Sequence, residues 1–383
     1  MNSGILLMNN VKSGIYSLKE KKFLAYGEAY SENLLIHGDS LIVLELLKEK
    51  YSGEIDCIYM DPPYCSGTKN EHYTDIFCQE EYFKMMKDIF TLSFEILSDK
   101  GYLLVQMGRE HAYVIRSLIE SIFGSDNFKN EIIVRRDDHK IYANMIHQLA
   151  SGYDVIFLFS KKPDTMLPAL KKSVDEGERK GYWKNLYRST TCPQQQYQLC
   201  GIYPHSGEWR WTEQKAIQAL QNYNKISDYA ARQHWNIVGE FDYIYERYVQ
   251  GKCDMDEFPI LRKKNSKIEF YIPPSDEIYV TDNWFDLAVR GDLTDFEHEV
   301  NKEIIRRIIG WLTKEGDFLL DPFLGSGTSA VVATEMNRKW IGIEKEQYCS
   351  TDIRNRINKT IDEIHRENGT MGYRFLELNE DKQ

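Results

Sequence analysis

Hydrophobic and polar positions follow two different periods along the first part of the chain. Segments rich in apolar residues predict strands at residues 33–39, 55–64, 102–108 and 153–163. Apolar residues spaced by three and four predict helices at residues 41–51, 80–101 and 111–124. The regular alternation of the two kinds of segment predicts a doubly wound, mostly parallel α/β sheet.

The same alternation returns near the C-terminal end. A helix is expected at residues 299–316, a strand, glycine turn and helix at residues 317–338, and a strand at residues 339–344. Between the two α/β regions the chain is polar and aromatic, with weak periodicity. We therefore expect a split α/β domain, residues 1–162 and 291–383, with residues 163–290 inserted between its halves.

Charge limits the kind of nucleic-acid surface that the protein could carry. The chain has 383 residues, and 48 Lys and Arg against 59 Asp and Glu give a net charge of −11. Such a chain cannot coat nucleic acid over its whole face, so a basic surface has to be local. Residues 129–188 supply one candidate, because twelve basic residues there outnumber eight acidic ones.

Composition also bounds the compartment. No apolar run approaches the roughly 18 residues of a spanning helix, and the N-terminus lacks the basic lead of a signal peptide. The seven cysteines form no C-x-x-C pair, which fits neither a disulfide framework nor the usual zinc spacing. We expect a cytoplasmic protein that has no membrane contact and no metal.

The first chemical motif is the sequence DPFLGSGTSA at residues 321–330. A strand runs here into a glycine turn and then a helix, whose N-terminus offers free N–H groups and a positive dipole end. Gly325 and Gly327 would let a ligand approach the backbone. Glu344, at the end of the next predicted strand, could accept hydrogen bonds from a ribose diol. The motif indicates an adenosine-containing cofactor without saying which.

The second motif is the sequence DPPY at residues 61–64, at the end of an apolar strand. The prolines stiffen the backbone and donate no hydrogen bonds, so the carbonyl groups around them are free to accept. One carboxylate, that of Asp61, and the Pro62 carbonyl could together take both hydrogens of an exocyclic amine. Tyr64 could stack on a flat ring. Open α/β sheets bind ligands at this edge.

Together the two motifs resemble the amino-methyltransferases of DNA, in which S-adenosylmethionine is the methyl donor. The order of the motifs resembles the β class, and further stretches resemble type III restriction-modification Mod subunits and their shorter adenine-specific relatives. The resemblance implies that residues 1–162 form the catalytic half, residues 163–290 a target-recognition domain and residues 291–383 the cofactor half. The expected activity is transfer of a methyl group to the N6 amine of an adenine flipped out of double-stranded DNA.

The resemblance also implies site residues. The catalytic residues would be Asp61, Pro62, Pro63 and Tyr64. The cofactor would be bound by Asp39, Asp61, Lys302, Asp321, Phe323, Gly325, Ser326, Gly327, Thr328 and Glu344. Two positions depart from the family pattern: Glu303 follows Lys302 where relatives often have proline, and Cys65-Ser66 replaces Asn-Thr after the catalytic motif.

Reading a DNA sequence requires side chains in a groove. Arg135, Arg136, His139 and Lys140 follow a predicted strand and are the expected DNA contacts, in a loop near residues 135–150. A homodimer and a separate restriction subunit are further expected partners. No Walker A motif with its lysine is present, so helicase or nuclease activity would come from another chain.

Three alternatives stay open at this point. Methylation of cytosine N4 uses the same amine chemistry. A nicotinamide-dependent oxidoreductase shares the glycine turn but gives the DPPY motif no role. A non-catalytic DNA-binding module would leave both motifs without a purpose.

Overall fold

The chain divides into two units in this computed structural model. The first unit contains Met1–Leu170 and Val280–Gln383, and the second contains Lys171–Tyr279. The structure describes residues 5–11, 14–28, 30–63, 79–136, 151–175, 179–190, 195–249, 258–289, 299–368 and 371–381. No helix in these ranges is both long enough and apolar enough to cross a bilayer.

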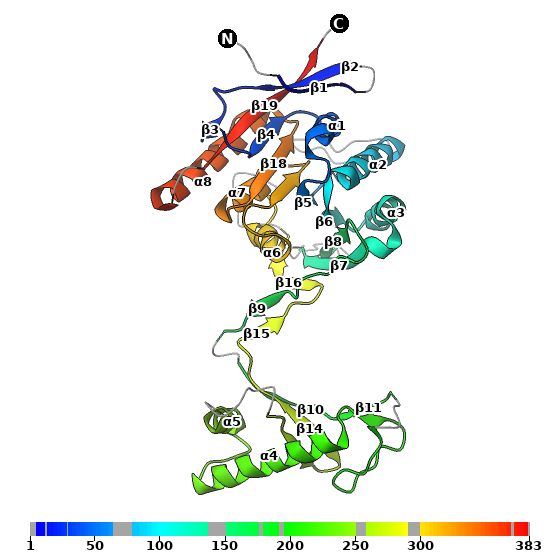
Figure 1. Cartoon of the computed structure of the whole chain (residues 1–383), viewed down its shortest axis with the longest axis vertical. Helices are drawn as coiled ribbons and strands as arrows, with labels where there is room; N and C mark the ends of the chain where they lie inside the picture. The colour runs from blue at the N-terminus through cyan, green and yellow to red at the C-terminus, as the bar shows by residue number, and fades with distance from the viewer. Residues whose placement is uncertain are drawn as a thin grey trace, which may run out of the picture. The chain divides into compact units, whose positions relative to one another are not determined.

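The first unit is built on one large sheet (Figure 1). Its strand order is β1-β2-β19-β4-β18-β17-β5-β6-β8-β7-β16, and β3 pairs with β19. The strands are β1 (Ile5–Val11), β2 (Gly14–Glu20), β3 (Tyr26–Gly27), β4 (Leu34–His37), β5 (Ile55–Met60), β6 (Leu97–Gly108), β7 (Phe128–Arg135), β8 (Tyr153–Ser160), β16 (Asn283–Ala288), β17 (Phe318–Asp321), β18 (Lys339–Glu344) and β19 (Gly372–Asp381). Strands β19, β4, β18, β17, β5 and β6 are parallel. The doubly wound, mostly parallel sheet expected from the sequence is confirmed.

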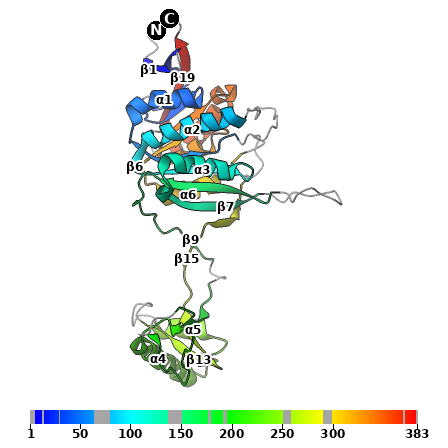
Figure 2. The same cartoon turned by 90° about the vertical axis from the view of Figure 1, so that its right-hand side faces the viewer.

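Helices cover both faces of this sheet. On one face lie α1 (Ser40–Tyr51), α2 (Gln79–Ile96) and α3 (Ala112–Phe123), which stand in front of the sheet in Figure 2. On the other lie α6 (Lys302–Leu312), α7 (Thr328–Glu335) and α8 (Asp352–Asn368). Strand β5 supplies both cores: Ile58 and Met60 pack with the first group, Cys57 and Tyr59 with the second. A strand buried on both faces needs apolar residues at successive positions, as this one has from Cys57 to Met60.

The chain reverses its winding between β17 and β5. From β17 it passes through α7 to β18 on one side, and from β5 through α2 to β6 on the other. Such a switch point leaves a crevice at the carboxyl ends of its two central strands, where open α/β sheets bind ligands. Both chemical motifs directly follow these two strands.

The predicted boundary between a helix and a strand at residues 101 and 102 was wrong. The helix expected at residues 80–101 ends at Ile96, and strand β6 begins at Leu97, where the expected strand began at residue 102. Leu97 pairs with Ile55, and the register shifts before Tyr102 pairs with Cys57. Gly101 permits this close path, because a Cβ there would lie 2.9 Å from the Ile55 carbonyl oxygen. Pairing with β5 therefore outweighs the helical spacing of the last residues.

In its described residues, the second unit has small sheets and the helices α4 and α5. Its elements are β9 (Lys171–Ser173), β10 (Tyr182–Asn185), β11 (Tyr187–Arg188), β12 (Glu208–Trp209), α4 (Glu213–Arg232), α5 (Phe241–Val249), β13 (Leu261–Lys264), β14 (Lys267–Ile272) and β15 (Glu277–Tyr279). Aromatic rings form one of its cores: Trp183, Phe241 and Tyr271 pack with ring centroids 4.7–5.2 Å apart. This arrangement explains the aromatic composition of the insert.

Candidate functional site at the switch point

The glycine turn follows β17 as predicted. Gly325 and Gly327 have φ angles of +55° and +83°, a region that side-chain-bearing residues rarely adopt. Gly327 is the N-cap of α7, and it has no side chain to cap the first N–H groups of that helix. Those groups are therefore available to a ligand at the positive end of the helix.

Asp321 shapes the turn from beneath. Its carboxylate accepts hydrogen bonds from Phe323 N at 3.0 Å and from Ser329 Oγ at 2.5 Å, and only 4% of the residue is exposed. Burial raises the pKa of Asp321 to about 7, although these hydrogen bonds act in the opposite direction. The last residue of β17 thus joins both ends of the turn.

Glu344 closes the turn from the next strand. One carboxylate oxygen accepts a hydrogen bond from Gly325 N and the other accepts one from Glu346 N, both at 2.9 Å. Burial raises the pKa of Glu344. A carboxylate at this strand end can accept hydrogen bonds from the hydroxyl groups of a ribose. The turn and this carboxylate fit an adenosine-containing cofactor.

Asp61 lies at the neighbouring strand end. Strands β17 and β5 pair in parallel with Leu320 opposite Ile58, so Asp61 and the start of the glycine turn extend from the same edge. Asp61 is half-buried and Pro62 is buried. Below them the Tyr59 hydroxyl donates to Gln106 Oε1 at 2.9 Å. Burial, and then the charges of Asp61 and Asp321, raise the pKa of Tyr59.

The other two residues of the catalytic motif are placed differently. Pro63 is half-buried beside Pro62, whereas Tyr64 lies outside the described residues. The structure therefore describes the carboxylate and the two prolines of the motif, and the predicted stacking by Tyr64 stays a prediction.

Asp39 lies at the same edge of the sheet, two residues beyond His37, which pairs with Glu344. Its carboxylate caps α1 by accepting hydrogen bonds from Leu41 N and Ile42 N. The next residue, Ser40, donates from its hydroxyl to the Pro322 carbonyl oxygen at 2.5 Å. This bond joins the N-terminus of α1 to the segment that leads into the glycine turn.

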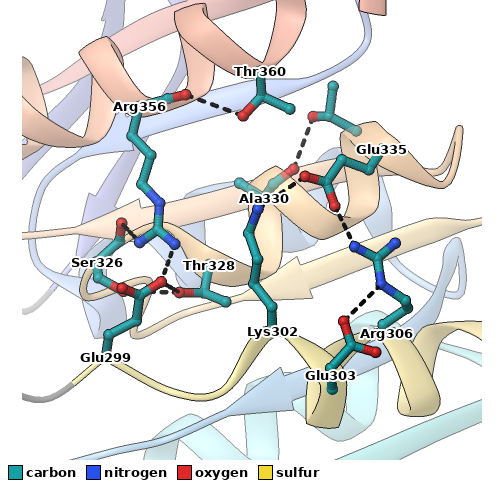
Figure 3. Close-up of polar contacts among 11 residues, drawn as sticks. Glu299, Lys302, Glu303, Arg306, Ser326, Thr328, Ala330, Glu335, Arg356 and Thr360 are labelled. Atoms are coloured by element: carbon teal, nitrogen blue, oxygen red, sulfur yellow. Dashed lines mark hydrogen bonds and ion pairs between the residues drawn. The ribbon is translucent and has the colours of Figure 1, made fainter. Parts of the chain in front are cut away.

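Lys302 is directed elsewhere. Its Nζ lies 2.9 Å from Glu335 Oε1, and Arg306 binds the other oxygen of the same carboxylate at 2.7 Å (Figure 3). Glu335 is the last residue of α7, at the opposite end from the turn. The predicted contact between Lys302 and a cofactor therefore gains no support from the position of this side chain.

The four expected DNA contacts separate into three groups. Arg135 ends β7 and is exposed. Arg136 is half-buried, and its Nε lies 2.7 Å from the carboxylate of Asp154, whose side chain is 1% exposed. His139 and Lys140 lie outside the described residues. Arg135 is available to a phosphate or base, while Arg136 is held in an ion pair.

Two polar residues at the turn were not foreseen. Glu299 and Arg356 contact Ser326 and Thr328 from outside the motif (Figure 3). Arg356 is 57 residues from Glu299 in the sequence, so no local spacing could have predicted their contact.

Among the described residues no three His, Cys, Asp or Glu side chains gather as a metal site would require.

The fold and site define an open α/β protein with an adenosine-type turn and an acid-proline motif at adjoining strand ends. Residues 55–354 match the family described as DNA methylase. The match spans most of the chain, and the chain belongs to this family. S-adenosylmethionine is the cofactor of the family, and the resemblance identified from the motifs is confirmed.

Several known proteins are similar to the chain. A probable type III restriction-modification enzyme HindVI Mod subunit from Haemophilus influenzae is 27% identical, over 87% of this chain and 51% of that protein. The type II methyltransferase M.EcaI from Enterobacter cloacae is 24% identical, over 90% of this chain and 75% of that protein. The chain thus spans about half the length of the Mod subunit. The solved PvuII DNA methyltransferase, cytosine-N4-specific, has a TM-score of 0.44 at 13% identity, over 86% of this chain and 94% of that chain.

Proposed function

We propose that the protein methylates DNA, transferring a methyl group from S-adenosylmethionine to the N6 amine of adenine. The observation that carries this proposal is the pairing of β17 with β5, from whose adjoining ends the glycine turn and Asp61 extend. The family match and the fit of Glu344 and the turn to an adenosine group support it.

The chemistry assigned to the chain concerns the amine. The lone pair of an adenine amine is delocalised into the ring, which makes the nitrogen a poor nucleophile. Asp61 and the Pro62 carbonyl accept hydrogen bonds from the two N–H groups of the amine. These bonds concentrate the lone pair on the nitrogen and orient it. Bound S-adenosylmethionine supplies the electrophilic methyl group. The target base has to leave the duplex to reach this edge of the sheet.

Recognition of the DNA sequence is assigned to the insert. We propose that residues 163–290 form the target-recognition domain and that Arg135 belongs to the DNA-contacting segment near residues 135–150. Support comes from the separate unit Lys171–Tyr279 and from the exposure of Arg135 at the end of β7.

The biological setting follows from the relatives. Of the proteins named above, one is a probable type III restriction-modification Mod subunit and another is a type II methyltransferase. We propose that this chain acts in a restriction-modification system or as an orphan modification enzyme. A homodimer and a separate restriction subunit stay predictions.

One experiment tests the reaction and its base together. The protein is incubated with duplex DNA and S-adenosylmethionine carrying a labelled methyl group, and the DNA is digested to nucleosides. The label should appear in N6-methyl-2′-deoxyadenosine. Label in N4-methyl-2′-deoxycytidine would show that the target base is cytosine. DNA that stays unlabelled would refute the methyltransferase proposal.

A further inference from the structure

The glycine turn is held from behind by two residues of distant segments (Figure 3). Arg356, on α8, donates from Nη1 to the Ser326 carbonyl oxygen at 3.0 Å and from Nη2 to the Glu299 carboxylate. The same carboxylate oxygen accepts a hydrogen bond from Thr328 Oγ1 at 3.1 Å. Of the two atoms that this pair contacts, Ser326 O belongs to the turn and Thr328 Oγ1 belongs to the first residue of α7.

This pair is well shielded from solvent. The side chains of Arg356 and Glu299 are 19% and 6% exposed. Charge-assisted hydrogen bonds in such a setting are about twice as strong as neutral ones. Removing one partner leaves the other charge buried and uncompensated, which is more damaging than losing an exposed ion pair. The negative charge of Glu299 also lies beside the N-terminal end of α7, where the helix dipole favours it.

The pair is anchored on regular structure at both sides. Two residues after Glu299, Asn301 donates from its backbone N to the Val289 carbonyl oxygen at 2.9 Å and from Nδ2 to the Ala288 carbonyl oxygen at 3.0 Å. Ala288 is the last residue of β16. Arg356 lies within α8, whose hydrophobic residues pack into the core beneath α7. The turn is thus braced between a strand and a helix.

We propose that Glu299 and Arg356 are positioning residues that hold residues 325–328 in the shape that binds the cofactor. The inference rests on the proposed function, because it assigns S-adenosylmethionine to this turn. Both residues act through Ser326 and Thr328. Their loss weakens cofactor binding and leaves the methyl-transfer step itself largely intact.

The second ion cluster on α7 provides a matched control. Arg306 and Lys302 bind Glu335 at the far end of the same helix. Arg306→Met therefore removes a cation that pairs with a partly buried carboxylate, without touching the turn. The test compares Arg306→Met with Arg356→Met and Glu299→Gln in the full chain. Binding of S-adenosylhomocysteine is measured by calorimetry, and the KM for S-adenosylmethionine and kcat are measured with DNA.

Arg356→Met and Glu299→Gln should raise the dissociation constant about tenfold, the effect of about one lost charge-assisted hydrogen bond. The KM should rise with it, while kcat at saturating cofactor stays within about threefold. Arg306→Met should bind as the wild type does. Arg356→Lys, which keeps the charge but replaces the forked guanidinium by an ammonium group, should recover part of the affinity. Affinities of Arg356→Met and Glu299→Gln equal to that of Arg306→Met would overturn the proposal.

Glu299→Gln covers the case in which Arg356→Met fails to fold, because it keeps the size of the side chain and removes its charge. Weaker binding by Glu299→Gln than by Arg306→Met supports the proposal, and equal binding by these two variants contradicts it. A wild-type protein that binds no S-adenosylhomocysteine would refute the proposed function itself, a result distinct from a failure of these variants.

Discussion

Replacing Asp321 by asparagine should change how the stability of the first unit depends on pH. Burial raises the pKa of Asp321 from its ordinary value of 3.8 to about 7. The folded protein therefore keeps this proton up to about neutral pH, whereas the unfolded chain releases it near pH 4. The stabilisation linked to the proton is complete below pH 3.8 and is lost as the pH rises through 7.

The size of the effect follows from the two pKa values. A shift of this size corresponds to about 4 kcal/mol between the two limits, of which about 2–3 kcal/mol falls between pH 5 and pH 8. Asparagine has the same shape and stays neutral, and its oxygen can still accept Phe323 N. The free energy of unfolding of Asp321→Asn should therefore gain about 2–3 kcal/mol on the wild type between pH 5 and pH 8.

Urea unfolding followed by circular dichroism at pH 5, 6, 7 and 8 measures this difference. Asp317→Asn is the matched control, because Asp317 is half-buried just before the same strand and caps Lys314 N. The control reports what the loss of another carboxylate at this strand does to stability. If Asp321→Asn kept the pH dependence of the wild type, Asp321 would not be protonated in the folded protein near pH 7.

Three other predictions test the site. Asp61→Ala should abolish methyl transfer while S-adenosylhomocysteine still binds, and a variant that methylated at near wild-type rate would remove Asp61 from catalysis. Arg135→Met should reduce the slope of log DNA affinity against log salt concentration by about one. Arg136→Met should leave that slope unchanged, because Arg136 pairs with a buried carboxylate. Equal slopes for the two variants would contradict this distinction. Gly327→Ala should weaken cofactor binding at least about tenfold, since φ is +83° and the new Cβ would lie 3.0 Å from Ile353 Cγ2; unchanged binding by calorimetry would show that the turn tolerates a side chain.

The two α/β halves could be predicted because their strands and helices carry strong, distinct periods. Cys57, Ile58, Tyr59 and Met60 form a continuous apolar run, as a strand with two buried faces requires. The helix α6 has a clear apolar stripe of Ile304, Ile305, Ile308 and Ile309. The motifs were equally visible, because glycine and proline mark backbone paths that few other residues can follow.

Other parts of the chain give no such signal. The 20-residue helix α4 was not foreseen, because four of its five buried residues are Ala216, Ala219, Asn222 and Ala230, which form no strong apolar stripe. The pairing of Lys302 with Glu335 and of Arg136 with Asp154 depends on which elements meet in the fold. Sequence spacing cannot show such meetings, and for this reason Glu299 and Arg356 also became visible only in the structure.

Asp61 and the glycine turn at residues 325–328 should face a single bound cofactor. A crystal structure of the protein with S-adenosylhomocysteine measures this arrangement. We expect the adenosine group at Glu344, the ligand over the turn, and its sulfur on the side of Asp61. A ligand bound away from the turn, or a sulfur directed away from the Asp61 carboxylate, would show that the two motifs do not form one site.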